Sequence, residues 1–418
     1  MRIAFVSQPI GSFTVPPGGS IDIWTYEVAR RIADRHQVVV YTRRKPGQPS
    51  VDFADGIEIR RLRVASDFRI VGGPLRRLRR LRSSGSGLAF TSPWHLPSYA
   101  AQVALDLHRL RPSVIHIHNF SQFVPLIRGL NPDARIVLHM HCEWLNQLAA
   151  HVVEPRVSRT DVVLGCSDYI ASAARRALPH QARRIRTMWN GVDFDLFDRV
   201  SSPPSREGSR ILFVGRISPE KGLHVLVDAF ERVARTHPLA QLDVIGPEWQ
   251  TPKEYLVGLS SDPRVRALAS FYDGDPSLGY GARLRERMAP SIASRVHFAG
   301  WTPRTALIDC YARSDVLVNP SLSEAFGMSL IEAMAARVPV VAARAGGMQD
   351  IVEHDRTGLL VEPADPVALA DALSALLASP PMRKRLADAG YERARSTFGW
   401  DRISESLLEV YRGGAGGS

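Results

Sequence analysis

The chain has 418 residues, 45% hydrophobic and 23% charged, which excludes bulk disorder and leaves room for two domains of about 200 residues. Its formal charge of +11 is concentrated in residues 60–82, where nine arginines face one acid, so a generally basic nucleic-acid-binding protein is excluded. No apolar run reaches the roughly 18 residues of a membrane helix, and the opening segment is too short for a secretory signal. Three widely spaced cysteines indicate neither a disulfide framework nor a metal pair. We therefore expect a cytoplasmic protein.

The amino-terminal half alternates short apolar runs with helical segments. A helix is expected over 21–35, after a loop that contains Gly18 and Gly19. Apolar runs predict strands at 2–7, 38–41, 114–117, 135–140 and 162–166. Strands that alternate with helices indicate a parallel sheet covered on both faces.

A second series of strands begins after a polar, proline-rich segment at 201–209, which is the expected linker. Its strands are predicted at 210–214, 242–245, 296–298, 316–318, 339–342 and 358–361. The fold class is therefore α/β, with two doubly wound Rossmann-like domains facing each other across a ligand-binding cleft. The expected limits are 1–200 for the first domain, 210–395 for the second, 396–412 for a helix packing back on the first, and 413–418 for a flexible tail.

The stretch Asn319 to Glu332, NPSLSEAFGMSLIE, carries the strongest chemical pattern. Glu324 falls in a loop at the carboxyl end of a strand, and Glu332 lies one turn into the following helix. Between them, the amides that open the helix suit an anion; they belong to Phe326, Gly327, Met328 and Ser329. Two carboxylates around an anion-binding helix start suit a ligand with both a phosphate and hydroxyls, such as a sugar nucleotide. A solvated helix with incidental acids is the alternative.

Two cations follow the strand at 210–214, in the segment GRISPEKG. Arg216 and Lys221 stand five residues apart on a strand-to-helix loop, where they can neutralise a diphosphate without a metal and stabilise a departing nucleotide. A surface ion pair is the alternative.

The chain resembles the retaining glycosyltransferases of family four, which have the GT-B fold. The resemblance rests on PPGGS, VIHIH, HMHCEW, CSDYI, WNGVD, FVGRISPEKG and the block from NPSLSEAFGMSLIE to LLVEPAD, in family order. It implies that Glu324 contacts the hydroxyls of the donor sugar and Glu332 the ribose of the nucleotide. It also favours a role for Gly18 and Gly19 at the donor phosphate or the acceptor, against a simple tight turn.

The family places a histidine in the loop after the strand at 135–140, where it hydrogen-bonds the donor sugar. We assign this role to His141 and expect His139 on the opposite face of the strand, packed behind the site. His118 is a weaker candidate that would help to bind the acceptor. Two patterns are discounted: the pair Asp193 and Asp195 as a metal motif, and Cys142 as a nucleophile.

The resemblance implies transfer of a sugar from a nucleotide-sugar donor to a small-molecule or lipid acceptor by front-face displacement. UDP-sugars are favoured over GDP-sugars by their frequency in the family. Because Arg216, Lys221 and a helix terminus supply positive charge, we expect no metal ion and no other cofactor. An epimerase or synthase on the same fold, or a non-catalytic basic membrane-binding protein, are the alternatives.

The arginine-rich stretch at 60–82 is not explained by the shared motifs. Leu75, Leu78 and Leu81 recur every three residues among its arginines, which predicts one apolar stripe flanked by cations. Peripheral attachment to an anionic membrane, capture of an acidic acceptor and a solvated loop remain open.

Overall fold

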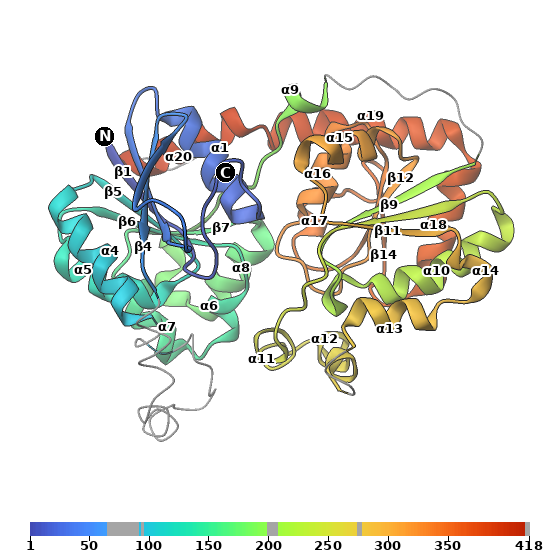
Figure 1. Ribbon diagram of the computed structural model, residues 1–418, viewed down its shortest axis with the longest axis horizontal. Coiled ribbons are helices and arrows are strands. Elements are labelled where there is room, and N and C mark those ends of the chain that lie inside the picture. Colours follow the sequence, from blue (N-terminus) through green and yellow to red (C-terminus); the bar gives the residue numbers. More distant parts are fainter. Residues whose placement is uncertain (65–91, 93–95, 199–207, 274–277, 414–418) are drawn as a thin grey trace. The chain divides into compact units, whose positions relative to one another are not determined.

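The computed structural model describes residues 1–64, 92, 96–198, 208–273 and 278–413. These residues form two compact units, one made of 1–190 and 400–418 and the other of 191–399. In each unit helices lie on both faces of a mainly parallel sheet (Figure 1). The α/β fold class and the two parallel-sheet domains predicted from the sequence are therefore confirmed. The predicted linker at 201–209 and tail at 413–418 lie almost wholly outside the described residues.

Unit 1 contains an eight-stranded sheet in the order β3-β4-β2-β1-β5-β6-β7-β8. Each strand predicted from an apolar run is present, because such strands are buried on both faces. The strands are β1 (Arg2–Val6), β2 (Gln37–Arg43), β3 (Val51–Ala54), β4 (Ile57–Leu62), β5 (Val114–His118), β6 (Arg135–Met140), β7 (Val162–Gly165) and β8 (Ile185–Thr187). The helices are α1 (Ser20–Ile32), α4 (Pro97–Leu110), α5 (Val124–Leu130), α6 (Trp144–Gln147), α7 (Ala150–Val157), α8 (Asp168–Ala177) and α20 (Trp400–Arg412).

Three strands of this sheet were not predicted. The strands β3 and β4 pair antiparallel around Asp55 and Gly56, both of which have positive φ. Only β3 departs from the parallel direction, and it forms one edge of the sheet. β8 forms the other edge and has three residues, too few to show a periodicity.

Unit 2 contains a six-stranded parallel sheet in the order β11-β10-β9-β12-β13-β14. The strands are β9 (Arg210–Val214), β10 (Gln241–Ile245), β11 (Val296–Gly300), β12 (Val316–Asn319), β13 (Val340–Ala343) and β14 (Leu359–Val361). The helices are α9 (Phe194–Phe197), α10 (Leu223–Thr236), α11 (Lys253–Leu256), α12 (Pro263–Ala267), α13 (Tyr280–Arg287), α14 (Pro290–Ala293), α15 (Arg304–Ala312), α16 (Met328–Ala335), α17 (Met348–Ile351), α18 (Pro366–Ala378) and α19 (Pro380–Thr397).

The helix α10 illustrates how the sequence produces this packing. Its apolar residues recur at helical spacing and are all buried; they are Leu223, Val225, Leu226, Val227, Ala229, Phe230, Val233 and Ala234. They join the hydrophobic core that the strands β9 and β10 share with α18. The neighbours β9 and β12 end at the same edge of the sheet, so the loops that follow them are brought together.

Candidate active site

The loops after β9 and β12 are locked against each other in unit 2. The backbone N–H of Leu322 donates to the carbonyl of Glu220 at 2.8 Å. Gly222 has a φ of 69°, and a Cβ atom there would lie 2.1 Å from the carbonyl oxygen of Pro320. Only glycine permits this approach. The two loops therefore present their side chains as one surface.

The predicted residues Lys221 and Glu324 meet on this surface as a direct ion pair. The Lys221 Nζ lies 2.6 Å from the Glu324 Oε2, and the two side chains are 15% and 16% exposed. Burial alone would raise the pKa of Glu324, but the charge and hydrogen bond of Lys221, a backbone hydrogen bond from Phe326 and the charge of Arg216 together lower it. Glu324 is therefore ionised, and the ammonium group of Lys221 can bind an anionic ligand while it remains paired with Glu324.

Arg216 is held beside this pair by its own partners. Its guanidinium donates to Glu220 at 3.0 Å and to the hydroxyl of Thr251 at 2.9 Å. It also lies over the ring of Trp249, 4.8 Å from the centroid. The Arg216 side chain remains one third exposed, so its charge is oriented but reachable.

The start of α16 is shaped by the same loop. Gly327 precedes the helix with a φ of 117°, and the side chain of Phe326 is buried, so that a ligand can meet only its backbone. Gly346 packs against the backbone of this loop and has a φ of 55°. A Cβ at Gly346 would lie 1.9 Å from the carbonyl oxygen of Glu324, so there is no room for a side chain. The helix start, with Met328 and Ser329 in its first turn, thus follows directly on Glu324.

Glu332 lies one turn into α16 and is 7% exposed. Its Oε2 accepts a hydrogen bond from the hydroxyl of Tyr311 at 2.7 Å. Burial raises the pKa of Glu332, and the charge of Arg304 and the bond from Tyr311 offset this only in part. Such a carboxyl group accepts hydrogen bonds from ligand hydroxyls at little further desolvation cost.

In unit 1, Gly18 and Gly19 lie at the start of α1 and are exposed. A Cβ at Gly18 would meet nothing within 4 Å, and one at Gly19 would meet only Asp22 at 3.9 Å. The fold of the described residues therefore does not itself require glycine at either position. Asp22, in the first turn of α1, has its pKa raised by burial and receives a hydrogen bond from Ser7.

Four histidines gather at the ends of β5 and β6. His139 and His141 lie side by side, with ring centroids 4.0 Å apart. The prediction that they point to opposite faces is wrong, because residues two apart along a strand share a face. The rings of His116, His118, His139 and His141 surround Trp24 of α1 at centroid distances of 5.2, 5.5, 4.6 and 6.1 Å.

Of these four side chains, His141 alone is partly exposed. His118 is fully buried with both ring nitrogens in hydrogen bonds, to Thr25 and to His141, which places it behind His141 rather than against an acceptor. Two residues that were not predicted from the sequence also help to hold His141: Thr25, through His118, and Asn119 directly. The Asn119 Oδ1 accepts from the backbone N–H of His141 at 2.6 Å. No motif spacing links these residues, because they come from α1 and from the turn after β5.

Among the described residues, one group of three side chains has the spacing of candidate metal ligands. Ring nitrogens of His116, His118 and His139 lie within 4.8 Å of one another. Both nitrogens of His118 are already engaged, and His116 is bonded through Nδ1 to the hydroxyl of Tyr411 at 2.8 Å. His118 therefore has no free ring nitrogen for a metal ion, whereas the Nε2 of His116 and both nitrogens of His139 are buried without a hydrogen-bond partner among the described residues.

The discounted patterns form no site in the described residues. Burial raises the pKa of the Cys142 thiol to about 12, so the thiolate is disfavoured at neutral pH. Asp193 and Asp195 lie at the start of the short helix α9 and belong to no group of three ligands among the residues described.

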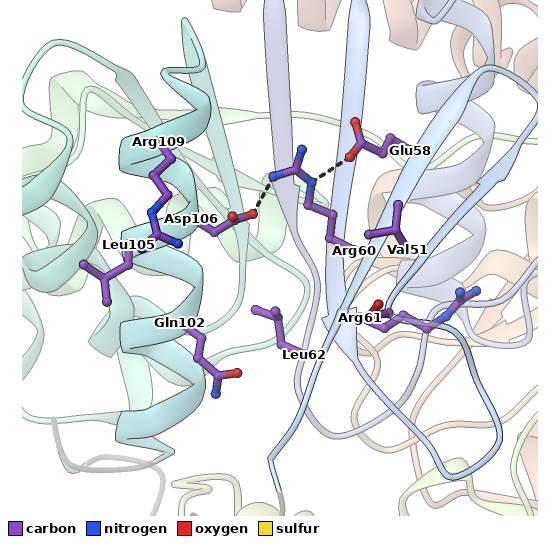
Figure 2. Close-up of a pocket in the computed structure, with 10 residues that line it drawn as sticks. Val51, Glu58, Arg60, Arg61, Leu62, Gln102, Leu105, Asp106 and Arg109 are labelled. Atoms are coloured by element: carbon purple, nitrogen blue, oxygen red, sulfur yellow. Dashed lines mark hydrogen bonds and ion pairs between the residues drawn. The ribbon is translucent and has the colours of Figure 1, made fainter.

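The arginine-rich stretch begins in β4, the strand next to the edge strand β3, where Arg60 and Arg61 are paired with acidic residues. Figure 2 shows Arg60 between Glu58 and Asp106, at 2.7 and 2.6 Å, in a pocket between β4 and α4. Arg61 contacts Asp52 at 3.0 Å. These two arginines therefore do not belong to a free basic surface, whereas residues 65–82 lie outside the described part of the chain.

Among the described residues, none of the helices combines the length and the apolar character needed to span a lipid bilayer.

Comparison with known proteins matches both halves of the chain. The family described as Glycosyltransferase Family 4 matches residues 21–196, and the family described as Glycosyl transferases group 1 matches residues 196–273 and 279–393. The D-inositol 3-phosphate glycosyltransferase of Xylanimonas cellulosilytica is 30% identical over 446 aligned residues, which cover 98% of this chain and 96% of that protein.

Solved structures resemble the chain over nearly its whole length. A sucrose-phosphate synthase from Thermosynechococcus elongatus gives a TM-score of 0.70 at 24% identity and covers 99% of this chain and 98% of its own. The Anabaena protein HepE, solved in complex with UDP and glucose, gives a TM-score of 0.68 at 20% identity and covers 99% of both chains. At these identities the likeness establishes a common fold.

Proposed function

Since the chain belongs to the family four glycosyltransferases and has their GT-B fold, we propose that it transfers a sugar with retention from a nucleotide-sugar donor to a small-molecule or lipid acceptor. The observation that carries the proposal is the ion pair of Lys221 and Glu324, 2.6 Å long, beside Arg216 and the start of α16. Cations for a diphosphate and a carboxylate for sugar hydroxyls thus stand together at the edge of one sheet.

Each residue has a role in this proposal. Arg216 and Lys221 bind the diphosphate and stabilise the charge that develops on it when the sugar leaves. Glu324 accepts hydrogen bonds from donor-sugar hydroxyls, and Glu332 accepts them from the ribose. The backbone N–H groups of Phe326, Gly327, Met328 and Ser329, at the start of α16, provide partial positive charge for the donor phosphate. In unit 1, His141 binds the donor sugar, and Gly18 and Gly19 approach the donor phosphate or the acceptor.

The proposed reaction is a front-face displacement. The bond from the anomeric carbon to the phosphate oxygen breaks as a bond to the acceptor oxygen forms on the same face. The proton of the acceptor hydroxyl passes to the departing phosphate oxygen, so no protein base is consumed. Glu324 is tied to Lys221, which suits it to hold hydroxyls rather than to act as the nucleophile of a retaining glycosidase.

UDP-sugars are the donors to test first. The HepE structure, which has the same fold, is a complex with UDP and glucose, and the D-inositol 3-phosphate glycosyltransferase is named for a phosphorylated polyol acceptor. The test is a panel of UDP- and GDP-sugars, scored by release of the nucleotide with and without candidate acceptors. Proton NMR of the product then reads the anomeric configuration. An inverted product would overturn the retaining assignment, and no turnover of any donor would overturn the proposal.

We further propose that the protein acts in the cytoplasm and touches an anionic membrane through the arginine-rich residues 65–82. This rests on the sequence alone. Flotation with anionic vesicles at low and moderate salt tests it, because binding through arginines weakens as salt screens them. Replacing the five arginines from 76 to 82 with glutamine should abolish flotation, and no flotation of the native chain at low salt would reject membrane contact.

A further inference from the structure

A continuous chain of hydrogen bonds runs from the backbone of α1 to His141. The hydroxyl of Thr25 lies 2.8 Å from the carbonyl oxygen of Ile21 and 3.1 Å from the Nε2 of His118. The Nδ1 of His118 lies 3.0 Å from the Nε2 of His141. Thr25 and His118 are fully buried, and His141 is partly exposed, so the chain leads from the core toward the surface.

Each link fixes the position of one proton. The carbonyl oxygen of Ile21 can only accept and is the nearer partner, at 2.8 Å against 3.1 Å for His118, so we assign the single hydroxyl proton of Thr25 to Ile21. The oxygen of Thr25 then faces His118 with a lone pair, and the Nε2 of His118 must carry a proton to make that contact. Since a neutral imidazole carries one proton, the Nδ1 of His118 is an acceptor, and it takes the proton that the Nε2 of His141 donates.

We propose that Thr25 and His118 are positioning residues that hold His141 as its Nε2–H tautomer and thereby present the Nδ1 lone pair to a substrate hydroxyl. The inference rests on the proposed function in taking the hydroxyl to belong to a sugar. It makes His141 an acceptor of a hydrogen bond at its free nitrogen, not a donor. Hydroxyls of a sugar meet this requirement, whereas a phosphate oxygen without a proton does not.

The surroundings of His118 and His141 favour the neutral state of both imidazoles. Burial, with the neighbouring histidines, lowers the pKa of His118 well below its usual range, and burial lowers the pKa of His141 to about 3. The rings of His116 and His139 pack around them. The backbone of His141 is also held in place, because its N–H donates to the Oδ1 of Asn119, and its ring is held by the contact with His118.

The test is the tautomer of His141 in the full chain, read from the ¹⁵N shifts of histidine-labelled protein at neutral pH without substrate. A His141→Gln variant assigns the signal. We expect protonated Nε2 and unprotonated Nδ1 at His141. In Thr25→Val, which keeps the shape and removes the hydroxyl, the Nδ1–H form should appear, and kcat/KM should fall about 5- to 30-fold. Thr25→Ser should restore both.

Thr160→Val is the matched control. Thr160 is a buried threonine of the same unit, and within the described part of the chain its hydroxyl bonds only a backbone carbonyl, that of Val157 at 2.7 Å. Thr160→Val should lose about as much stability as Thr25→Val. It should change neither the tautomer of His141 nor the ratio of kcat/KM to the fraction of folded protein. A native His141 protonated on Nδ1 would overturn the relay, as would an unchanged tautomer in Thr25→Val. An Nε2–H tautomer in a chain that turns over no donor would reject the proposed function and leave the relay standing.

Discussion

At the scale of single residues, Lys221 and Glu324 depend on each other. The two side chains form a largely buried ion pair. Removing one of them leaves the charge of the other buried without its partner. We expect Lys221→Ala and Glu324→Ala each to lower kcat/KM about 10²- to 10³-fold and to destabilise the protein by about 2–4 kcal/mol. Steady-state kinetics and chemical unfolding measure the two effects.

The matched control is Lys384→Ala, which removes a lysine from an exposed ion pair with Asp388 at 2.7 Å. It should change neither activity nor stability appreciably, because exposed pairs contribute little. The double variant at Lys221 and Glu324 should be less destabilised than the two single losses added together. Kinetics of the native enzyme in either single variant would contradict the assignment.

Glu332 and Glu324 should respond to pH in opposite directions. The pKa of Glu332 is raised in the folded state, so the folded protein binds a proton more readily and stability falls as pH rises from about 4.5 upward. The pKa of Glu324 is lowered, so its contribution to stability is present above about 4.5 and is lost as pH falls.

Glu332→Gln should therefore raise the melting temperature relative to the native chain, and this gain should grow with pH. Glu324→Gln should lower it, and this loss should also grow with pH. If Glu332 binds ribose, Glu332→Gln should also weaken donor binding about 10- to 100-fold. Melting curves between pH 4 and 8 decide the matter, and equal slopes in the two variants would contradict the stated directions.

At the scale of elements, two glycines that each precede a helix should respond differently to substitution by alanine. Gly346 has a left-handed backbone and no room for a Cβ beside Glu324, so Gly346→Ala should cost about 2–5 kcal/mol of stability and most of the activity. Gly18 has open space around it, so Gly18→Ala should leave the melting temperature within a degree or two while lowering kcat/KM. Full activity in Gly18→Ala would remove that loop from the proposed site.

The sequence predicts the elements that bury apolar runs and misses those that do not. The strands β9, β12 and β13 coincide with apolar runs that are buried on both faces of the sheet, whereas β11 was predicted at 296–298 although its residues alternate between more buried and more exposed positions. The hairpin of β3 and β4 was missed although Asp55-Gly56 between alternating residues is a typical hairpin turn.

Side-chain partners were harder to foresee than elements. The sequence brings Lys221 and Glu324 to the same edge of a sheet, but not to 2.6 Å, because their contact depends on how Gly222 and Pro320 approach. Likewise, Arg60 and Arg61 read as part of a free basic stretch until Asp106 and Asp52 are placed beside them. Contacts between residues far apart in the chain leave no local pattern.

At the scale of the whole molecule, we expect transfer to need no metal ion. Arg216, Lys221 and the start of α16 already supply positive charge for the donor diphosphate. Transfer in excess EDTA should match transfer in buffer and in added Mg²⁺ or Mn²⁺. Activity that EDTA abolishes and a divalent cation restores would contradict this expectation and return attention to Asp193 and Asp195.

The final helix has a consequence for how the chain is made. Unit 1 consists of 1–190 together with 400–418, so its last helix, α20, is synthesised only after all of unit 2. Apolar residues of α20 are buried in unit 1, and Tyr411 bonds His116 at 2.8 Å. During translation, unit 1 therefore lacks α20 until the whole of unit 2 has been synthesised. Pulse proteolysis of nascent chains stalled at different lengths should find 191–399 resistant before α20 has emerged from the ribosome and 1–190 resistant only afterwards; earlier resistance of 1–190 would show that α20 is dispensable for its folding.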